Sequence, residues 1–182
     1  MSNNVFTGID RAELERVLDR GFDHGDNPIE PYTDDVGGWP LRCCLGFSEV
    51  GDNMALIAWS PMDWKGVYAE TGPIFVHAQP CDGPEHSDRL PRRLDQQPMV
   101  LRPYTHDNRI AYDRVQHVPE GGSLTELVTE LLELDDVAFV HGRNVRGGCY
   151  SFDARRNSQY VRGQSSPEDQ DSLLTFYDVT SR

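Results

Sequence analysis

Apolar residues recur at the spacing of a helix in two stretches of the chain. The first predicts a helix over about residues 10–20, which Asp10 can cap and Gly21 can end. A second helix is predicted to begin after Ser123, which can cap it together with Glu126. The apolar face of that second helix is broad and consists of Leu124, Leu127, Val128, Leu131 and Leu132.

Short apolar runs bounded by glycine, proline or polar residues predict strands elsewhere. They lie at Leu41–Phe47, Asn53–Ser60, Gly72–Ala78, Met99–Tyr104, Arg109–Val115, Val137–His141, Cys149–Phe152 and Leu173–Val179. The polar segment 154–171 is predicted to be irregular. Strands and helices do not alternate regularly, so we expect an α+β fold. Its form would be a largely antiparallel, curved sheet, with barrel-like closure as one version, and two main helices packed against it.

The length of 182 residues fits a single domain that spans 1–182. The formal net charge of -13 repels phosphate groups, so we expect neither nucleic acid nor an anionic membrane as a partner. No apolar run is long enough to cross a bilayer, and the N-terminus lacks the pattern of a signal peptide. We therefore expect a cytoplasmic protein with reduced thiols.

The tripeptide Phe-Val-His occurs twice, at 75–77 and at 139–141. Each copy ends a short apolar run, which would place its histidine at the end of a strand. Histidine titrates near neutral pH, so His77 and His141 are candidates for shared acid–base catalysis. Glu70 could orient one of the two imidazoles. Two partly buried histidines bonded to the backbone are the alternative interpretation.

Candidate contacts to a substrate lie in the same parts of the chain. Arg42 and Arg143 are among few cations in an acidic sequence, and an arginine can bind a carboxylate or phosphate through two parallel hydrogen bonds. Tyr68 and Cys149, from the two stretches that hold the histidines, complete this set. An ion pair with a surface carboxylate, or a buried structural thiol, would explain the same residues without a substrate.

A metal site is a further alternative, since three residues separate His77 from Cys81. Cys44, Cys149 and His141 could supply additional ligands to zinc. The adjacent pair Cys43 and Cys44 argues against this, because neighbouring side chains are poorly placed to bind one ion. No Cys-x-x-Cys pair is present either. We expect no metal and no other cofactor.

Three blocks of sequence carry a resemblance to a known family. They are WPLRCCL at 39–45, YAETGPIFVHAQPC at 68–81 and FVHGRNVRGGCYSFDARR at 139–156. Together they resemble the bacterial family catalogued as domain of unknown function 1203, over about residues 38–156. Leu41 stands where the family pattern has its first cysteine, and Cys44 matches the second. The resemblance implies no activity, but it points to Arg42, Glu70, Gly72, Pro73, His77, His141, Arg143, Gly148 and Cys149.

Three functional hypotheses follow from these residues. The first is a cofactor-independent enzyme that uses histidine acid–base chemistry, of the lyase, isomerase or hydrolase type, on a small polar or anionic molecule. The second is a module that binds a small molecule or a protein without catalysis. The third is a metal-dependent enzyme with a Cys/His site. The sequence leaves the oligomeric state open.

Overall fold

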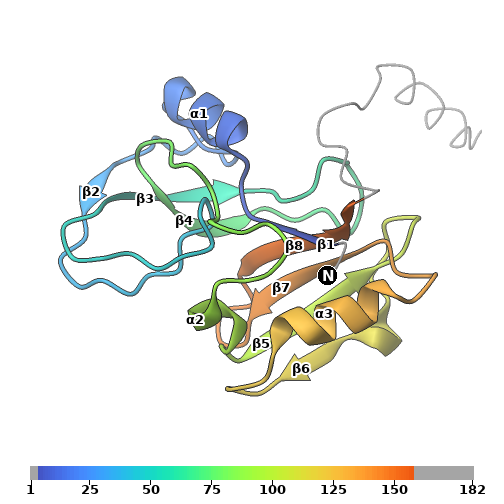
Figure 1. Ribbon diagram of the computed structural model, residues 1–182. Coiled ribbons are helices and arrows are strands. Elements are labelled where there is room, and N and C mark those ends of the chain that lie inside the picture. Colours follow the sequence, from blue (N-terminus) through green and yellow to red (C-terminus); the bar gives the residue numbers. More distant parts are fainter. Residues whose placement is uncertain (1–3, 158–182) are drawn as a thin grey trace, which may run out of the picture.

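The structure is a computed structural model that describes residues 4–157, and within these residues two antiparallel sheets lie side by side (Figure 1). Among the described strands, the larger sheet has the order β1-β8-β7-β5-β6 and the smaller sheet the order β2-β3-β4. The elements along the chain are β1 (Asn4–Thr7), α1 (Arg11–Arg20), β2 (Tyr32–Thr33), β3 (Asn53–Trp59), β4 (Gly72–His77), α2 (Arg92–Asp95), β5 (Met99–Tyr104), the 3-10 turn η1 (Tyr112–Arg114), β6 (Gln116–Val118), α3 (Leu124–Leu132), β7 (Phe139–Asn144) and β8 (Tyr150–Arg156).

Helix α3 covers one face of the larger sheet (Figure 1). The Ser123 side chain accepts a hydrogen bond from the backbone N–H of Glu126, which caps the helix as its sequence predicts. The apolar face of α3 packs against strand residues that point toward it. This core contains Leu124, Val128, Leu131, Leu132, Phe6, Leu101, Val140 and Phe152. Because strand side chains alternate, the neighbouring residues of β5, β7 and β8 point to the opposite face of the sheet.

Helix α1 packs against the smaller sheet and forms a second core with it. The Asp10 side chain caps the helix, and Gly21 ends it in the left-handed conformation with φ of 73°. Leu14 and Val17 are buried against strand residues Met54, Ile57, Ile74 and Val76. Burying each such aliphatic side chain contributes about 1.5–3 kcal/mol.

Residues 40–47, which we call the cysteine loop, lie where the two cores meet. Leu45 belongs to the core of the larger sheet, whereas Cys43 belongs to the core of the smaller one. The backbone at Leu45 is left-handed, with φ of 58°, which is rare for a bulky residue. The Arg42 side chain donates from Nε to the carbonyl oxygen of Tyr150 in β8 at 2.7 Å. The cysteine loop therefore connects the two halves of the molecule.

The expected fold class is confirmed in its coarser form, as a mixture of helices and antiparallel sheets. The two main helices are α1 and α3, and α2 adds one short turn. The expected single curved sheet is replaced by two sheets. No barrel-like closure is found among the strands of residues 4–157, because the two end strands of each sheet do not pair with each other.

Two of the strand predictions are wrong. Leu41–Phe47 turns back on itself instead, with the Leu41 N–H bonded to the Gly46 carbonyl at 2.9 Å. The segment contains apolar residues because they pack into the two cores between which the loop lies. The segment Arg109–Val115 contains the turn η1, and strand pairing with β5 resumes only in β6. Strands β1 and β2 were not expected.

Two further predictions fall wholly or partly outside the described residues. The strand at Leu173–Val179 lies beyond them, as does most of the irregular segment 154–171. Residues 154–156 of that segment belong to β8. Within residues 4–157, none of the helices combines the length and apolar character that crossing a membrane requires.

Candidate metal centre

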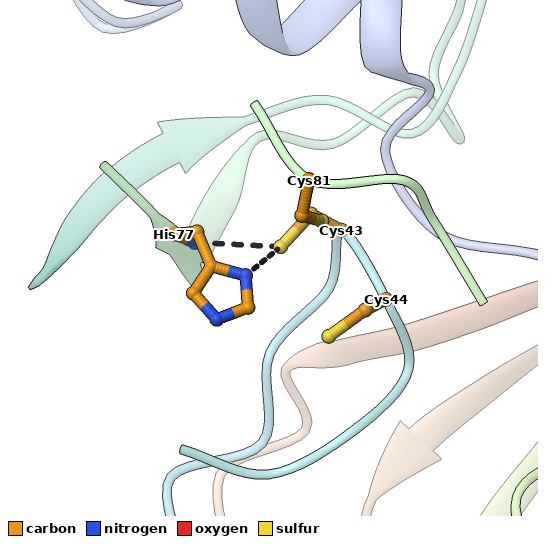
Figure 2. Close-up of side chains that lie close together, drawn as sticks. All are labelled: Cys43, Cys44, His77 and Cys81. Carbon is orange, nitrogen blue, oxygen red and sulfur yellow. Dashed lines mark hydrogen bonds between the residues drawn. The ribbon is translucent and has the colours of Figure 1, made fainter. Parts of the chain in front are cut away.

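Three segments bring four potential metal ligands together. The cysteine loop supplies Cys43 and Cys44, β4 ends at His77, and the chain that leaves β4 supplies Cys81. One ligand atom from each residue can be chosen so that all four lie within 4.8 Å of one another. Figure 2 shows the four side chains converging on one small space. Distant parts of the sequence thus form one compact cluster.

Backbone contacts fix the positions of these segments. β3 and β4 pair in register, with Met54 opposite His77, so the end of β4 is held by a strand of the smaller core. The cysteine loop lies along β4, because the Arg42 N–H donates to the Phe75 carbonyl at 2.8 Å. The backbone N–H of His77 donates to the Cys43 sulfur at 3.3 Å. These contacts place the loop directly beside His77.

Cys43 and Cys44 are neighbours in the sequence, and the fold nevertheless brings both sulfur atoms into the cluster. In a strand, two neighbouring side chains would point to opposite faces. Here Cys43 and Cys44 lie in a turn, and both sulfur atoms belong to the same compact cluster. Adjacency in the sequence, which counted against the pair as ligands of one ion, therefore does not keep the two sulfur atoms apart.

The separations within the cluster suit a single tetrahedral ion. Zinc–sulfur bonds of about 2.3 Å place two sulfur ligands of a tetrahedron about 3.8 Å apart. The observed limit of 4.8 Å exceeds that value by only about 1 Å. An iron–sulfur cluster inserts several metal ions between its cysteines and therefore needs wider spacing.

The close contacts between the thiols and the imidazole shift the pKa values of the residues in this cluster. Hydrogen bonds with Cys44 and Cys81 raise the pKa of His77 to about 10. Hydrogen bonds from Cys43 and Cys44 lower the pKa of Cys81, and those with Cys44 and Cys81 raise the pKa of the buried Cys43. The cluster thus favours a thiolate at Cys81 next to a protonated imidazole.

A carboxylate stands behind the histidine. Nδ1 of His77 faces the Cys43 sulfur at 3.3 Å, while Nε2 lies 3.9 Å from Oδ2 of Asp52. Metal-binding histidines commonly direct their second nitrogen to a carboxylate, which orients the ring. The His77 side chain is 28% exposed, so the cluster is accessible from solvent. Asp52 was not among the residues that the sequence indicated.

The other candidate catalytic residues lie in a second cluster, on the larger sheet. His141 is fully buried there, with Nε2 3.4 Å from Oδ2 of Asp153. Glu70 forms ion pairs with Arg143 and with Arg102. Among the described residues, His77 and His141 therefore have different partners. That they share acid–base work stays a prediction.

The remaining candidates have structural surroundings of their own. Arg42 is buried, and its guanidinium donates to the carbonyls of Tyr150 and Pro40, which fixes the cysteine loop. Tyr68 contacts the ring of Tyr112 at 6.4 Å between centroids. Cys149 lies in the turn between β7 and β8, and its thiol is 3.7 Å from the Gly147 carbonyl oxygen. Cys149 and His141 are not part of the four-residue cluster.

Sequence reasoning also missed the charged partners Arg102, Asp153 and Arg155. A signal for Arg102 was present, since it is a lone charge within the apolar run Met99–Tyr104. Asp153 and Arg155 lie in a stretch whose strand was predicted to end at Phe152. Extending that strand by four residues would have placed both on the face that carries His141.

Comparison with known proteins identifies a family. Residues 38–156 match a family model described as "Protein of unknown function (DUF1203)", which covers well over half of the chain. No curated protein and no solved structure matches. The chain therefore belongs to the DUF1203 family, as the resemblance in its sequence indicated.

Proposed function

We propose that this member of the DUF1203 family binds one zinc ion through Cys43, Cys44, His77 and Cys81. The observation that carries the proposal is the convergence of three sulfur atoms and one imidazole nitrogen within 4.8 Å. Asp52 supports it, because its carboxylate faces the histidine nitrogen that would stay off the metal.

The donor set favours zinc among the common metals. Thiolate and imidazole are borderline to soft ligands, which zinc accepts in any tetrahedral combination. Magnesium and calcium prefer oxygen ligands, and the cluster of four offers none. Iron and copper(I) could also bind to sulfur-rich sites, so the identity of the metal must be measured.

Four protein ligands fill a tetrahedral shell, which is typical of structural rather than catalytic zinc. The ion would join the cysteine loop to the end of β4 and to the segment that follows it. The cysteine loop also reaches the core of the larger sheet through Leu45 and β8 through Arg42. The proposed role is therefore to fix the junction between the two halves of the protein.

Metal analysis of the purified chain tests this proposal. Protein made in zinc-supplemented medium and purified without chelator should contain about one zinc per chain. Stripping the ion should lower the thermal midpoint by about 10 °C, the shift expected when a ligand present at about 1,000 times its Kd is removed. Differential scanning calorimetry of stripped and reloaded protein measures this shift.

Cobalt(II) provides an independent check of the ligands. Cobalt bound by several thiolates in a tetrahedral site gives intense sulfur-to-metal absorption, which oxygen ligands do not produce. Stripped protein titrated with cobalt should show this absorption and reach saturation at one equivalent. A chain with less than about a tenth of an equivalent of any metal and no such absorption would contradict the proposal. If the chain instead contains about one equivalent of iron or copper, the metal site is confirmed but its metal is not zinc.

A further inference from the structure

A second group of charged residues occupies the face of the larger sheet opposite α3. Cross-strand pairing aligns Arg102 of β5 with His141 of β7, and His141 with Asp153 of β8. Arg143, two residues after His141, points to the same face. Aromatic rings surround the charges, with Tyr104 stacked on Phe139 at 4.6 Å between centroids. The strands thus hold a charged group in a largely apolar setting.

Two arginines of this group share one carboxylate. Oε1 of Glu70 lies 2.7 Å from Nη1 of Arg102 and also forms an ion pair with Nη2 of Arg143. The Arg143 side chain is only 5% exposed, whereas those of Arg102 and Glu70 are 24% and 41% exposed. The Glu70 carboxylate is therefore accessible to solvent, while the Arg143 guanidinium that it contacts is buried.

Among the described residues, the two arginines form ion pairs with a single carboxylate between them, that of Glu70. Asp153 is already paired with Arg155, which donates to both of its oxygens at 3.0–3.1 Å. Within residues 4–157, the buried Nε of Arg143 has no hydrogen-bond partner. Burial and the positive charge of Arg102 lower the pKa of Arg143. An unpaired buried donor beside a second cation favours an anion that can present both of its oxygens, whereas Glu70 contacts the arginines through Oε1.

The carboxylate between the arginines comes from a connecting segment, not from the sheet. Residues 60–71 link β3 to β4 and contain no helix or strand. This link starts and ends in the smaller sheet and extends toward the strands of the larger one (Figure 1). Its contacts with the larger half include the Tyr68–Tyr112 ring contact and the ion pairs of Glu70. Glu70 is therefore held in place by its side-chain contacts and not by strand pairing.

We infer that Arg102 and Arg143 form a binding site for a small molecule with a carboxylate group, and that Glu70 occupies the place of that carboxylate in the unliganded protein. A planar carboxylate can meet guanidinium groups through paired hydrogen bonds, whereas Glu70 contacts both arginines through Oε1. The site is separate from the four ligands of the metal centre and does not require zinc to be bound.

Removing the competing side chain tests the inference. In Glu70→Ala the arginines lose their shared anion, and because Arg143 is then buried without it, circular dichroism must first show that the variant is folded. We expect propionate, which resembles the missing side chain, to bind Glu70→Ala at least 10-fold more tightly than wild type in calorimetric titrations. Propionate should also raise the thermal midpoint of the variant, and sodium chloride at equal ionic strength should not.

Matched controls separate the site from a general effect of charge. Glu85→Ala also removes one carboxylate, from a side chain that is 89% exposed, and should bind propionate as wild type does. Adding Arg102→Gln to Glu70→Ala should abolish the gain in affinity for propionate.

Equal affinity for propionate in wild type and Glu70→Ala, or a gain that persists without Arg102, would overturn the inference. Tighter binding of inorganic phosphate than of propionate would overturn the carboxylate class. Zinc content measured in every variant keeps this result distinct from the fate of the metal proposal.

Discussion

Cys81→Ser is expected to lower the affinity of the chain for zinc by about 100- to 1,000-fold. Structural zinc sites with four ligands bind with about 10–16 kcal/mol, so one ligand accounts for about a quarter of that free energy. Cys81 suits the experiment because it is only partly buried and serine is almost its size. Competition with a chromophoric chelator measures the affinity, and circular dichroism confirms that the variant folds when zinc is in excess.

Cys149→Ser is the matched control, since Cys149 is a partly buried thiol outside the cluster. Its affinity for zinc should stay within about twofold of wild type. Asp52→Asn should fall between the two, with a loss of about 10-fold, because Asp52 orients the histidine without touching the metal. A Cys81→Ser variant that binds zinc as tightly as Cys149→Ser would remove Cys81 from the site.

Asp153→Asn is expected to lower the free energy of unfolding at pH 7 by about 3–4 kcal/mol. Asp153 is 6% exposed and lies between Arg155 and His141. An amide cannot neutralise Arg155, and its NH₂ group would face a cation. The Arg155 side chain is 28% exposed, so solvent compensates the remaining charge only in part, and the loss exceeds what the pair itself contributes. Urea denaturation of wild type and variant measures the difference.

The effect of Asp153→Asn should depend on pH. Burial favours a raised pKa for Asp153, but hydrogen bonding with His141 and the charge of Arg155 outweigh it, so the pKa is lowered. A carboxylate whose pKa is lowered on folding stabilises the native state above its unfolded value of about 3.9 and loses that effect at lower pH. The difference between wild type and variant should therefore be full at pH 7 and shrink below about pH 4.

His141 adds a separate change in the stability of wild type. Burial lowers its pKa, so His141 is neutral in the folded protein near pH 7. The unfolded chain binds a proton at this residue below about pH 6.5, which favours unfolding as the pH falls.

Asp113→Asn is the control for Asp153→Asn. Its side chain is 80% exposed, and the substitution should change the free energy of unfolding by less than about 0.5 kcal/mol. If Asp153→Asn lowers the free energy of unfolding by less than about 1 kcal/mol, Asp153 does not stabilise the fold in the way described here.

Local patterns predicted the elements whose stabilising contacts are local. The cap at Asp10 and the apolar faces of α1 and α3 could be read directly, because a helix forms its hydrogen bonds within one segment. Strands β3 and β5 were also found where alternation or an apolar run indicated them. The cysteine loop was not, because the left-handed turn at Leu45 depends on two cores that assemble from distant parts of the chain.

The candidate site was predictable residue by residue but not as an arrangement. His77 was identified from its place at a strand end, and Cys44 and Cys81 were considered as its partners. The repeated Phe-Val-His made shared acid–base catalysis by the two histidines the first hypothesis. In the structure, His77 ends a strand of the smaller sheet and His141 lies within the larger one. A shared tripeptide describes local strand preference and carries no information about which strands pair.

The position of the cysteine loop along β4 also bears on how the molecules behave toward one another. β4 is the last strand of the smaller sheet, and its outer edge is met by the loop through the Leu41–Phe75 bridge and the Arg42 N–H. An uncovered edge strand offers unpaired backbone groups to the edge of another molecule, which is a common route to aggregation. If zinc helps to hold the loop in place, losing the metal weakens the cover of this edge. The ion would then protect the protein against self-association as well as against unfolding.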